Sequence, residues 1–216
     1  MNNKRQWLNE FITEVIDGWM LTDLRRLLND IPHRPNAAGN CNFPIALYVF
    51  ACIEFLGQLT SVTPINTNQG GYTTNSIIGF INDFFPDDFK QKIQPYQNNF
   101  VNIFRNGLAH NYFAKNAGIS RTEIEPLQVN EQGMLVLDAD RFAEAFIASI
   151  IKLKEVIRID SNLADRIVDR YGNLYQDHLR FQFTPTTTRI STASLAHPDT
   201  RLTTTTPPPP PKETSS

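Results

Sequence analysis

The segment that most constrains the fold is an apolar helix that we expect from Asn42 to about Leu59. Asn42 is a residue type that caps helices, and Pro44 suits the first turn of a helix. Up to Leu59, apolar residues occur on nearly every side of the helix, so no face is suited to water. Other elements must therefore surround this helix, and we expect it to be the central buried element.

The apolar periodicity of the remaining sequence predicts further helices around this centre and one β-hairpin. A four-residue spacing from Gln6 to about Ile31 predicts one long helix or two consecutive ones. Alternation from Arg121 to Leu137, around the turn residues 130–133, predicts the hairpin. Other helices are expected from Thr74 or Asn75 to Phe85, from Asp87, from about Pro95 past His110, after a cap at Asp138, and from roughly Asn162 to Leu179. The predicted fold class is all-α, a helical bundle with a small β-hairpin insertion.

The chain divides into a helical domain over residues 1–182 and a tail over residues 183–216. With 216 residues and 41% hydrophobic content, the sequence can bury a sizeable core in one domain. The tail is rich in Thr, Ser and Pro, and it has too little apolar content to offset the entropy lost on ordering, so we expect it to be disordered. Its proline run, 207–211, suits a spacer or a ligand for a partner that binds extended proline helices.

Charge, cysteine content and hydropathy exclude several classes of function. A net charge of −2 and a pI near 6.1 argue against a strongly basic protein that binds nucleic acid without regard to sequence. The two cysteines do not form a disulfide framework, and the amino terminus lacks the apolar centre of a signal peptide. The longest apolar run, 43–53, is short for a membrane span. We expect a cytoplasmic protein with no membrane partner, no cofactor and no metal site.

The segment from Ile93 to Ala114 has an unusually low charge. Its twenty-two residues carry one formal charge, Arg105, where an average composition would give roughly five. Helical spacing puts Phe100, Phe104, Leu108 and Tyr112 on a core stripe, and it puts Asn102, Asn106 and Ala109 on the opposite face, flanked by Arg105 and His110. Gly107 destabilises a helix by up to about 1 kcal/mol relative to alanine, which indicates a compensating packing or binding role. A solvated helix face would instead carry Lys and Glu.

Arginine and histidine side chains together suit the cleavage of an RNA phosphodiester by its own 2′-hydroxyl. An imidazole with an ordinary pKa of about 6.5 can accept or donate a proton near neutral pH. A guanidinium can bind two phosphate oxygens and stabilise the charge of the transition state. Asn106, four residues before His110, is placed to orient the imidazole or the substrate.

The sequence from Arg105 to His110 resembles the signature of HEPN domains (higher eukaryotes and prokaryotes nucleotide-binding). That signature has an arginine, a polar residue directly after it, and a histidine after four to six intervening positions; Arg105, Asn106 and His110 match it. The resemblance implies an all-α bundle and a metal-independent endoribonuclease whose active site forms across a homodimer. It also implies RNA as substrate, a toxin or defence role, and a possible cognate antitoxin or nucleotidyltransferase as partner. Arg105, Asn106 and His110 would be the catalytic residues.

Other interpretations of the same residues stay open. Arg105 could pair with a carboxylate such as Glu54 while His110 satisfies a backbone carbonyl, although Glu54 also fits a solvent-facing position near a helix end. The domain could be a non-catalytic module that binds a nucleotide or a protein, or a scaffold with a recruiting tail. The spacing recurs by chance at Arg26 and His33, where Leu27 follows the arginine and Pro32 interrupts the helix. Four arginines near the carboxyl end are candidate phosphate ligands or an ordinary solvated face: Arg158, Arg166, Arg170 and Arg180.

Overall fold

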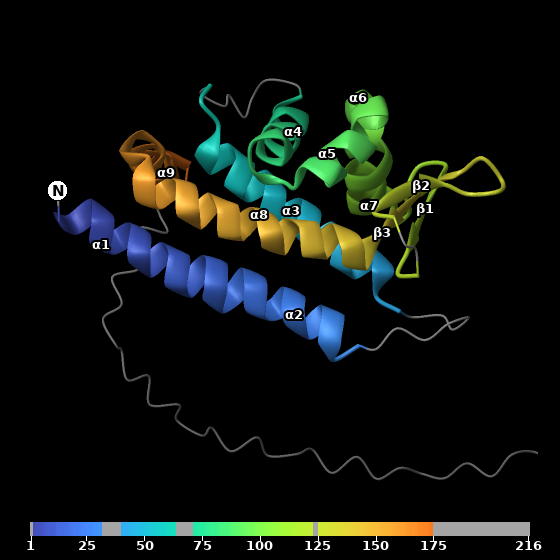
Figure 1. Cartoon of the computed structure of the whole chain (residues 1–216), viewed down its shortest axis with the longest axis horizontal. Helices are drawn as coiled ribbons and strands as arrows, with labels where there is room; N and C mark the ends of the chain where they lie inside the picture. Colours follow the sequence, from blue (N-terminus) through green and yellow to red (C-terminus); the bar gives the residue numbers. More distant parts are fainter. Residues whose placement is uncertain (1, 32–39, 64–70, 123–124, 175–216) are drawn as a thin grey trace, which may run out of the picture. The chain divides into compact units, whose positions relative to one another are not determined.

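The computed structural model describes residues 2–31, 40–63, 71–122 and 125–174, and it is mostly helical with a small three-stranded mixed sheet (Figure 1). The all-α prediction is therefore confirmed at the level of a mostly helical fold. The predicted tail, 183–216, and the end of the last predicted helix at Leu179 lie outside the described residues.

The amino-terminal helical pattern is confirmed as one uninterrupted run. It comprises α1 (Asn2–Glu10), the π-helical segment η1 (Phe11–Leu21) and α2 (Thr22–Asn29), and the residues at the junctions stay in the right-handed helical region. Phe11, Ile16 and Leu24 of this run are buried, as their spacing predicts.

Helix α3 (Asn42–Thr60) is the central element, as predicted. It contacts α4 (Tyr72–Phe84), α8 (Ala139–Ile159) and α9 (Ser161–Leu174). Among the described residues, α3 is the one helix long and apolar enough to cross a bilayer, and 61% of that apolar window is buried inside the protein, as in the core helix of a bundle. A Cβ at Gly57 would lie 2.1 Å from the Ser76 carbonyl oxygen, so glycine is what lets α3 and α4 approach this closely.

The predicted cap of α3 and the predicted start of α4 are wrong, and the predicted cap of α8 is confirmed. Cys41, with φ 54°, precedes α3, and Asn42 is already helical; its Nδ2 donates instead to the Ile119 carbonyl. Helix α4 begins at Tyr72, before the predicted Thr74 or Asn75, because Gly71 with φ +87° makes the turn there. Asp138 caps α8 as predicted, since its Oδ1 accepts the Arg141 backbone N–H at 2.9 Å.

The predicted hairpin is present, but it belongs to a larger sheet. Strands β2 (Leu127–Val129) and β3 (Leu135–Asp138) pair antiparallel, with Leu127 opposite Leu137. A third strand, β1 (Ala117–Ser120), pairs parallel with β3 on its other side, giving the order β1-β3-β2. Sequence reasoning missed β1 because four residues, one of them glycine, are too few to show alternation.

The segment that carries Arg105 is a succession of short helical pieces. Pro86 precedes α5 (Asp87–Ile93), which confirms the predicted break. A 3₁₀ turn, η2 (Gln94–Tyr96), then leads into α6 (Gln97–Phe100), the π-helical η3 (Val101–Arg105) and α7 (Asn106–Asn111). In Figure 1 α6 and α7 lie next to the sheet, at one end of the described bundle.

Candidate functional site

The backbone around Arg105 departs from regular α-helix. The N–H of Asn106 bonds to the carbonyl of Val101, five residues earlier, so Arg105 is the last residue of a short π-helical segment. Such segments arise when one extra residue is accommodated in a helix, and they occur often at functional sites. Arg105 thus closes the π-helical segment, and His110 lies in the α-helix that follows it, α7.

The predicted core stripe is confirmed for three of its four residues. Phe100, Phe104 and Leu108 are buried, whereas Tyr112 is 60% exposed. The placement of Tyr112 in the stripe is wrong because α7 ends at Asn111 and Tyr112 has φ 65°, which turns its side chain off the helical wheel. On the other face Asn102, Ala109 and His110 are exposed and Asn106 is half-buried.

Arg105 binds Glu54 of α3. Its Nε and Nη2 both donate to Glu54 Oε2, at 3.1 and 2.8 Å, and Nη1 donates to Asn106 Oδ1 at 3.0 Å. The two charged side chains are 22% and 11% exposed, so the pair is largely screened from water. The suggested pairing of Arg105 with Glu54 is therefore present, and the solvent-facing position of Glu54 is wrong.

Thr73 completes this network, and sequence reasoning did not find it. Its Oγ1 donates to Glu54 Oε1 at 2.8 Å from the first turn of α4. The available signal was Glu54 itself, because a carboxylate in an apolar helix needs donors for both oxygens. Glu54 satisfies that need with Arg105 on one oxygen and Thr73 on the other.

This network leaves part of the guanidinium open. A guanidinium has five N–H donors, and the bonds to Glu54 and Asn106 use three of the five on Arg105. Nη1 and Nη2 each keep one N–H that bonds to no other described residue. Glu54 and Asn106 thus fix the orientation of the guanidinium, while its exposed edge retains two donors suited to an anion such as phosphate.

His110 is exposed, and no hydrogen bond, ion pair or ring contact joins it to another described residue. The alternative in which His110 satisfies a backbone carbonyl is not seen among those residues. Five residues along a regular helix turn about 140°, so Arg105 and His110 of one chain point in different directions. The structure does not bring these two side chains together within one chain.

The low-charge face next to Arg105 is partly covered by the chain itself. A Cβ at Gly107 would lie 2.7 Å from the Phe113 carbonyl oxygen and 3.0 Å from the Lys115 nitrogen. The Lys115 backbone N–H donates to the Ile103 carbonyl, and Lys115 Nζ donates to Asn102 Oδ1 at 2.9 Å. The close packing of residues 113–115 explains why a glycine stands at position 107.

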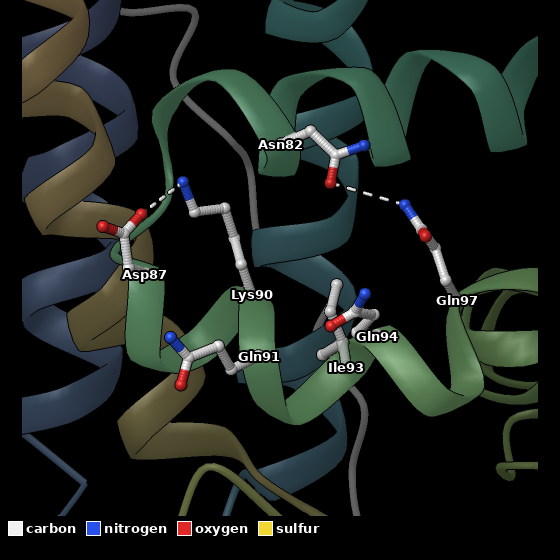
Figure 2. Close-up of a pocket in the computed structure, with 7 residues that line it drawn as sticks. All are labelled: Asn82, Asp87, Lys90, Gln91, Ile93, Gln94 and Gln97. Atoms are coloured by element: carbon white, nitrogen blue, oxygen red, sulfur yellow. Dashed lines mark hydrogen bonds and ion pairs between the residues drawn. The ribbon is translucent and has the colours of Figure 1, made fainter.

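A separate polar hollow of about 280 Å³ lies where α4, α5 and η2 meet (Figure 2). Amide side chains dominate its lining, which comprises Asn82, Asp87, Lys90, Gln91, Ile93, Gln94 and Gln97. Lys90 bonds to Asp87, and this bond lowers the pKa of the Asp87 carboxyl. None of the three predicted site residues lines the hollow, so it is not part of the candidate site.

Of the other residues with reactive or charged side chains, some take part in the packing of the fold and others lie outside the described residues. Burial raises the pKa of the Cys52 thiol to about 12, so it is a poor nucleophile at neutral pH. Arg170 donates to the carbonyls of Gln58 and Thr63 near the end of α3, so it is not part of an ordinary solvated face. Arg180, His33, His178 and His197 lie outside the described residues. Within the described residues no group of three His, Cys, Asp or Glu side chains could hold a metal ion.

No family description, curated protein or solved structure matches this chain. The assignment of a functional site here therefore depends on the chemistry and placement of Arg105, Asn106 and His110.

Proposed function

We propose that this protein is a metal-independent endoribonuclease of HEPN type whose active site forms between two copies of the chain. The observation that carries the proposal is the contrast within one short helix. Arg105 is held in place by Glu54 and Asn106 and keeps two N–H donors, whereas His110 is exposed and bonds to no other described residue.

The reaction needs one proton acceptor, one proton donor and a cation near the phosphate. In the proposed step His110 accepts the proton of an RNA 2′-hydroxyl, whose oxygen then bonds to the adjacent phosphorus. The bond from phosphorus to the 5′-oxygen breaks, and this oxygen takes a proton from water. The products are a 2′,3′-cyclic phosphate and a 5′-hydroxyl. Arg105 stabilises the negative charge on the phosphoryl oxygens.

The helix geometry supports a site that is shared between two copies of the chain. Because Arg105 and His110 point about 140° apart on one helix, a single chain does not direct both side chains at one phosphate. Two helices that face each other across a two-fold axis would direct Arg105 of one copy and His110 of the other at the same group. A toxin or defence role, with an antitoxin or nucleotidyltransferase as partner, stays a prediction from the resemblance.

The direct test incubates purified protein with RNA in excess EDTA and analyses the ends of the products. We expect 2′,3′-cyclic phosphate ends from the wild type and a loss of at least 100-fold in rate in Arg105→Ala and His110→Ala, as for removal of a general base or a charge-stabilising group. Arg26→Ala is the matched control, because Arg26 is an exposed arginine in the chance repeat of the spacing. Activity unchanged in the two site variants would refute the assignment.

Mixing the two inactive variants tests the shared site. After subunit exchange, a dimer of Arg105→Ala with His110→Ala contains one site in which both residues are intact. We expect part of the activity to return on mixing. If the mixture stays as inactive as its components, the residues do not act between copies.

A non-catalytic binding module is the second candidate, and the Arg105–Glu54 ion pair favours it. A guanidinium already neutralised by a carboxylate contributes less to a transition state than a free one does. This alternative predicts no cleavage of RNA, together with a nucleotide or protein ligand that protects residues 101–111 from hydrogen exchange. The EDTA assay separates the two functions.

A further inference from the structure

An exposed aromatic cluster lies directly after His110. Tyr112 and Phe113 are each 60% exposed, and both rings pack edge-on against Phe43 of α3 with centroids 5.6 Å apart. The Tyr112 and Phe113 rings also meet edge-on at 5.6 Å. Large apolar side chains grouped on a surface indicate a binding site more often than scattered ones do.

The backbone holds these rings in place at some cost. Among the described residues, three other than glycine have positive φ, namely Cys41, Tyr112 and Asn116, and all three lie in the segments that carry or follow the aromatic cluster. Such conformations cost on the order of 1–3 kcal/mol each and occur often at functional sites. The packing of residues 113–115 on Gly107 further restricts the turn. The rings are therefore presented by a tightly packed turn rather than by a loose loop.

The groups around the aromatic cluster suit a nucleic acid strand. From Ile93 to Asn116 the chain has two cations, Arg105 and Lys115, and no carboxylate. The exposed side chains after Leu108 comprise the imidazole, the two rings, Lys115 and the amides of Asn111 and Asn116. Aromatic rings beside cations and amides are the groups with which proteins bind single-stranded RNA, because bases stack on rings and phosphates attract cations.

We propose that Phe43, Tyr112 and Phe113 form a stacking platform for a nucleobase of single-stranded RNA. The platform takes an unpaired base whatever its identity, since every base offers a flat π-face. This inference rests on the proposed function for its biological meaning, because the stacked base would belong to a nucleotide next to the bond that His110 acts upon.

The test uses an RNA that cannot be cleaved. A single-stranded 2′-O-methyl oligonucleotide lacks the attacking hydroxyl, and 2-aminopurine at one position loses fluorescence when it stacks on an aromatic ring. Titration with the wild type in EDTA should quench this fluorescence. We expect Tyr112→Leu and Phe113→Leu to bind on the order of tenfold more weakly and to quench less.

Two further variants make the result specific. Trp19→Leu removes an aromatic side chain of similar exposure, 61%, from a different helix, and it should leave quenching unchanged. Tyr112→Phe keeps the ring and should behave like the wild type, whereas Tyr112→Leu keeps the backbone strain and loses the ring. Far-UV circular dichroism confirms that each variant is folded.

The outcomes separate this inference from the proposed function. Ring-dependent quenching without cleavage by the wild type would support the platform and refute the nuclease. Cleavage by the wild type, together with quenching by the leucine variants equal to that by the wild type, would support the nuclease and refute the platform. Absence of quenching by the wild type, together with dissociation of a dimer on Tyr112→Leu in sedimentation experiments, would overturn the platform in favour of a contact between copies.

Discussion

Two arginines that are largely shielded from water each hold a carboxylate, and they differ in what else they bind. The Arg121 side chain is 3% exposed, and its Nε donates to Asp140 at 2.8 Å. Its remaining bonds go to three backbone carbonyls, those of Leu28, Ile31 and Asn40. Arg105 is 22% exposed, and among the residues that the structure describes it binds the side chains of Glu54 and Asn106 alone.

Arg121 connects segments of the fold, whereas Arg105 keeps two N–H donors that bond to no other described residue. Arg121 joins the end of α2 and the approach to α3 to the start of α8 through its bonds to three backbone carbonyls and to Asp140. Arg105 is oriented by its neighbours, but it donates to no backbone carbonyl of the described residues. We therefore expect stability to depend on Arg121 more strongly than on Arg105, and RNA cleavage to depend on Arg105 and not directly on Arg121.

The largest effect on stability is expected from Arg121→Met. This change removes a buried guanidinium that donates to the partly exposed Asp140 and to three backbone carbonyls, and the loss of these charge-assisted hydrogen bonds is expected to cost about 3–5 kcal/mol in all. Urea unfolding followed by circular dichroism measures the loss. Arg141→Met is the control, because Arg141 pairs with Glu144 on the surface and should scarcely shift the midpoint. Equal midpoints for the two variants would mean that Arg121 does not connect these segments.

A smaller loss, about 2–3 kcal/mol, is expected from Arg105→Met. Glu54 keeps the bond from Thr73, so one of its oxygens remains satisfied when the guanidinium is removed. Adding Glu54→Met should restore part of the stability, since it removes the uncompensated buried charge. If Arg105→Met were as destabilising as Arg121→Met, Arg105 would connect segments of the fold as Arg121 does, and the proposed difference between them would be wrong.

Periodicity predicted the helices of this fold well and their ends less well. The all-round apolar character of residues 42–59 predicted the central helix, because only burial suits such a sequence. The start of α3 was placed correctly but explained wrongly: Asn42 bonds to Ile119, which lies far along the chain. The short β1 strand likewise depends on a long-range contact, its pairing with β3, which periodicity does not encode.

The sequence nominated the residues of the candidate site, whereas much of the geometry around them could not be predicted. The missing charges and the motif pointed to Arg105 and His110, and Glu54 was one named partner for Arg105. Thr73 and the π-helical segment were not predictable, because the first depends on where α4 packs and the second on a single inserted residue. Arg121 was missed entirely, since nothing in its neighbourhood in the sequence indicates that it would be buried.

Gly107→Ala extends the comparison to the backbone of the Arg105 segment. The new Cβ would lie within 3.0 Å of three backbone atoms of residues 113–115, so the turn must shift, at a cost of about 1–2 kcal/mol. Gly79→Ala in α4 is the matched control, because nothing lies within 4 Å of a Cβ there and alanine should stabilise that helix by up to about 1 kcal/mol. Thermal unfolding distinguishes the opposite signs. Stabilisation by both changes would show that residues 113–115 do not pack on Gly107.

The smallest effect on stability is expected from His110→Ala. The imidazole is exposed and makes no hydrogen bond or ion pair with another described residue, so its loss should change the free energy of unfolding by less than about 0.5 kcal/mol. Combined with the expected loss of RNA cleavage, that result would show that His110 is needed for the reaction but not for folding, whereas Arg121 is needed for folding. A loss above about 2 kcal/mol would instead show that His110 is buried in the folded protein or in a dimer, and a buried imidazole without a free edge is a poor general base for RNA.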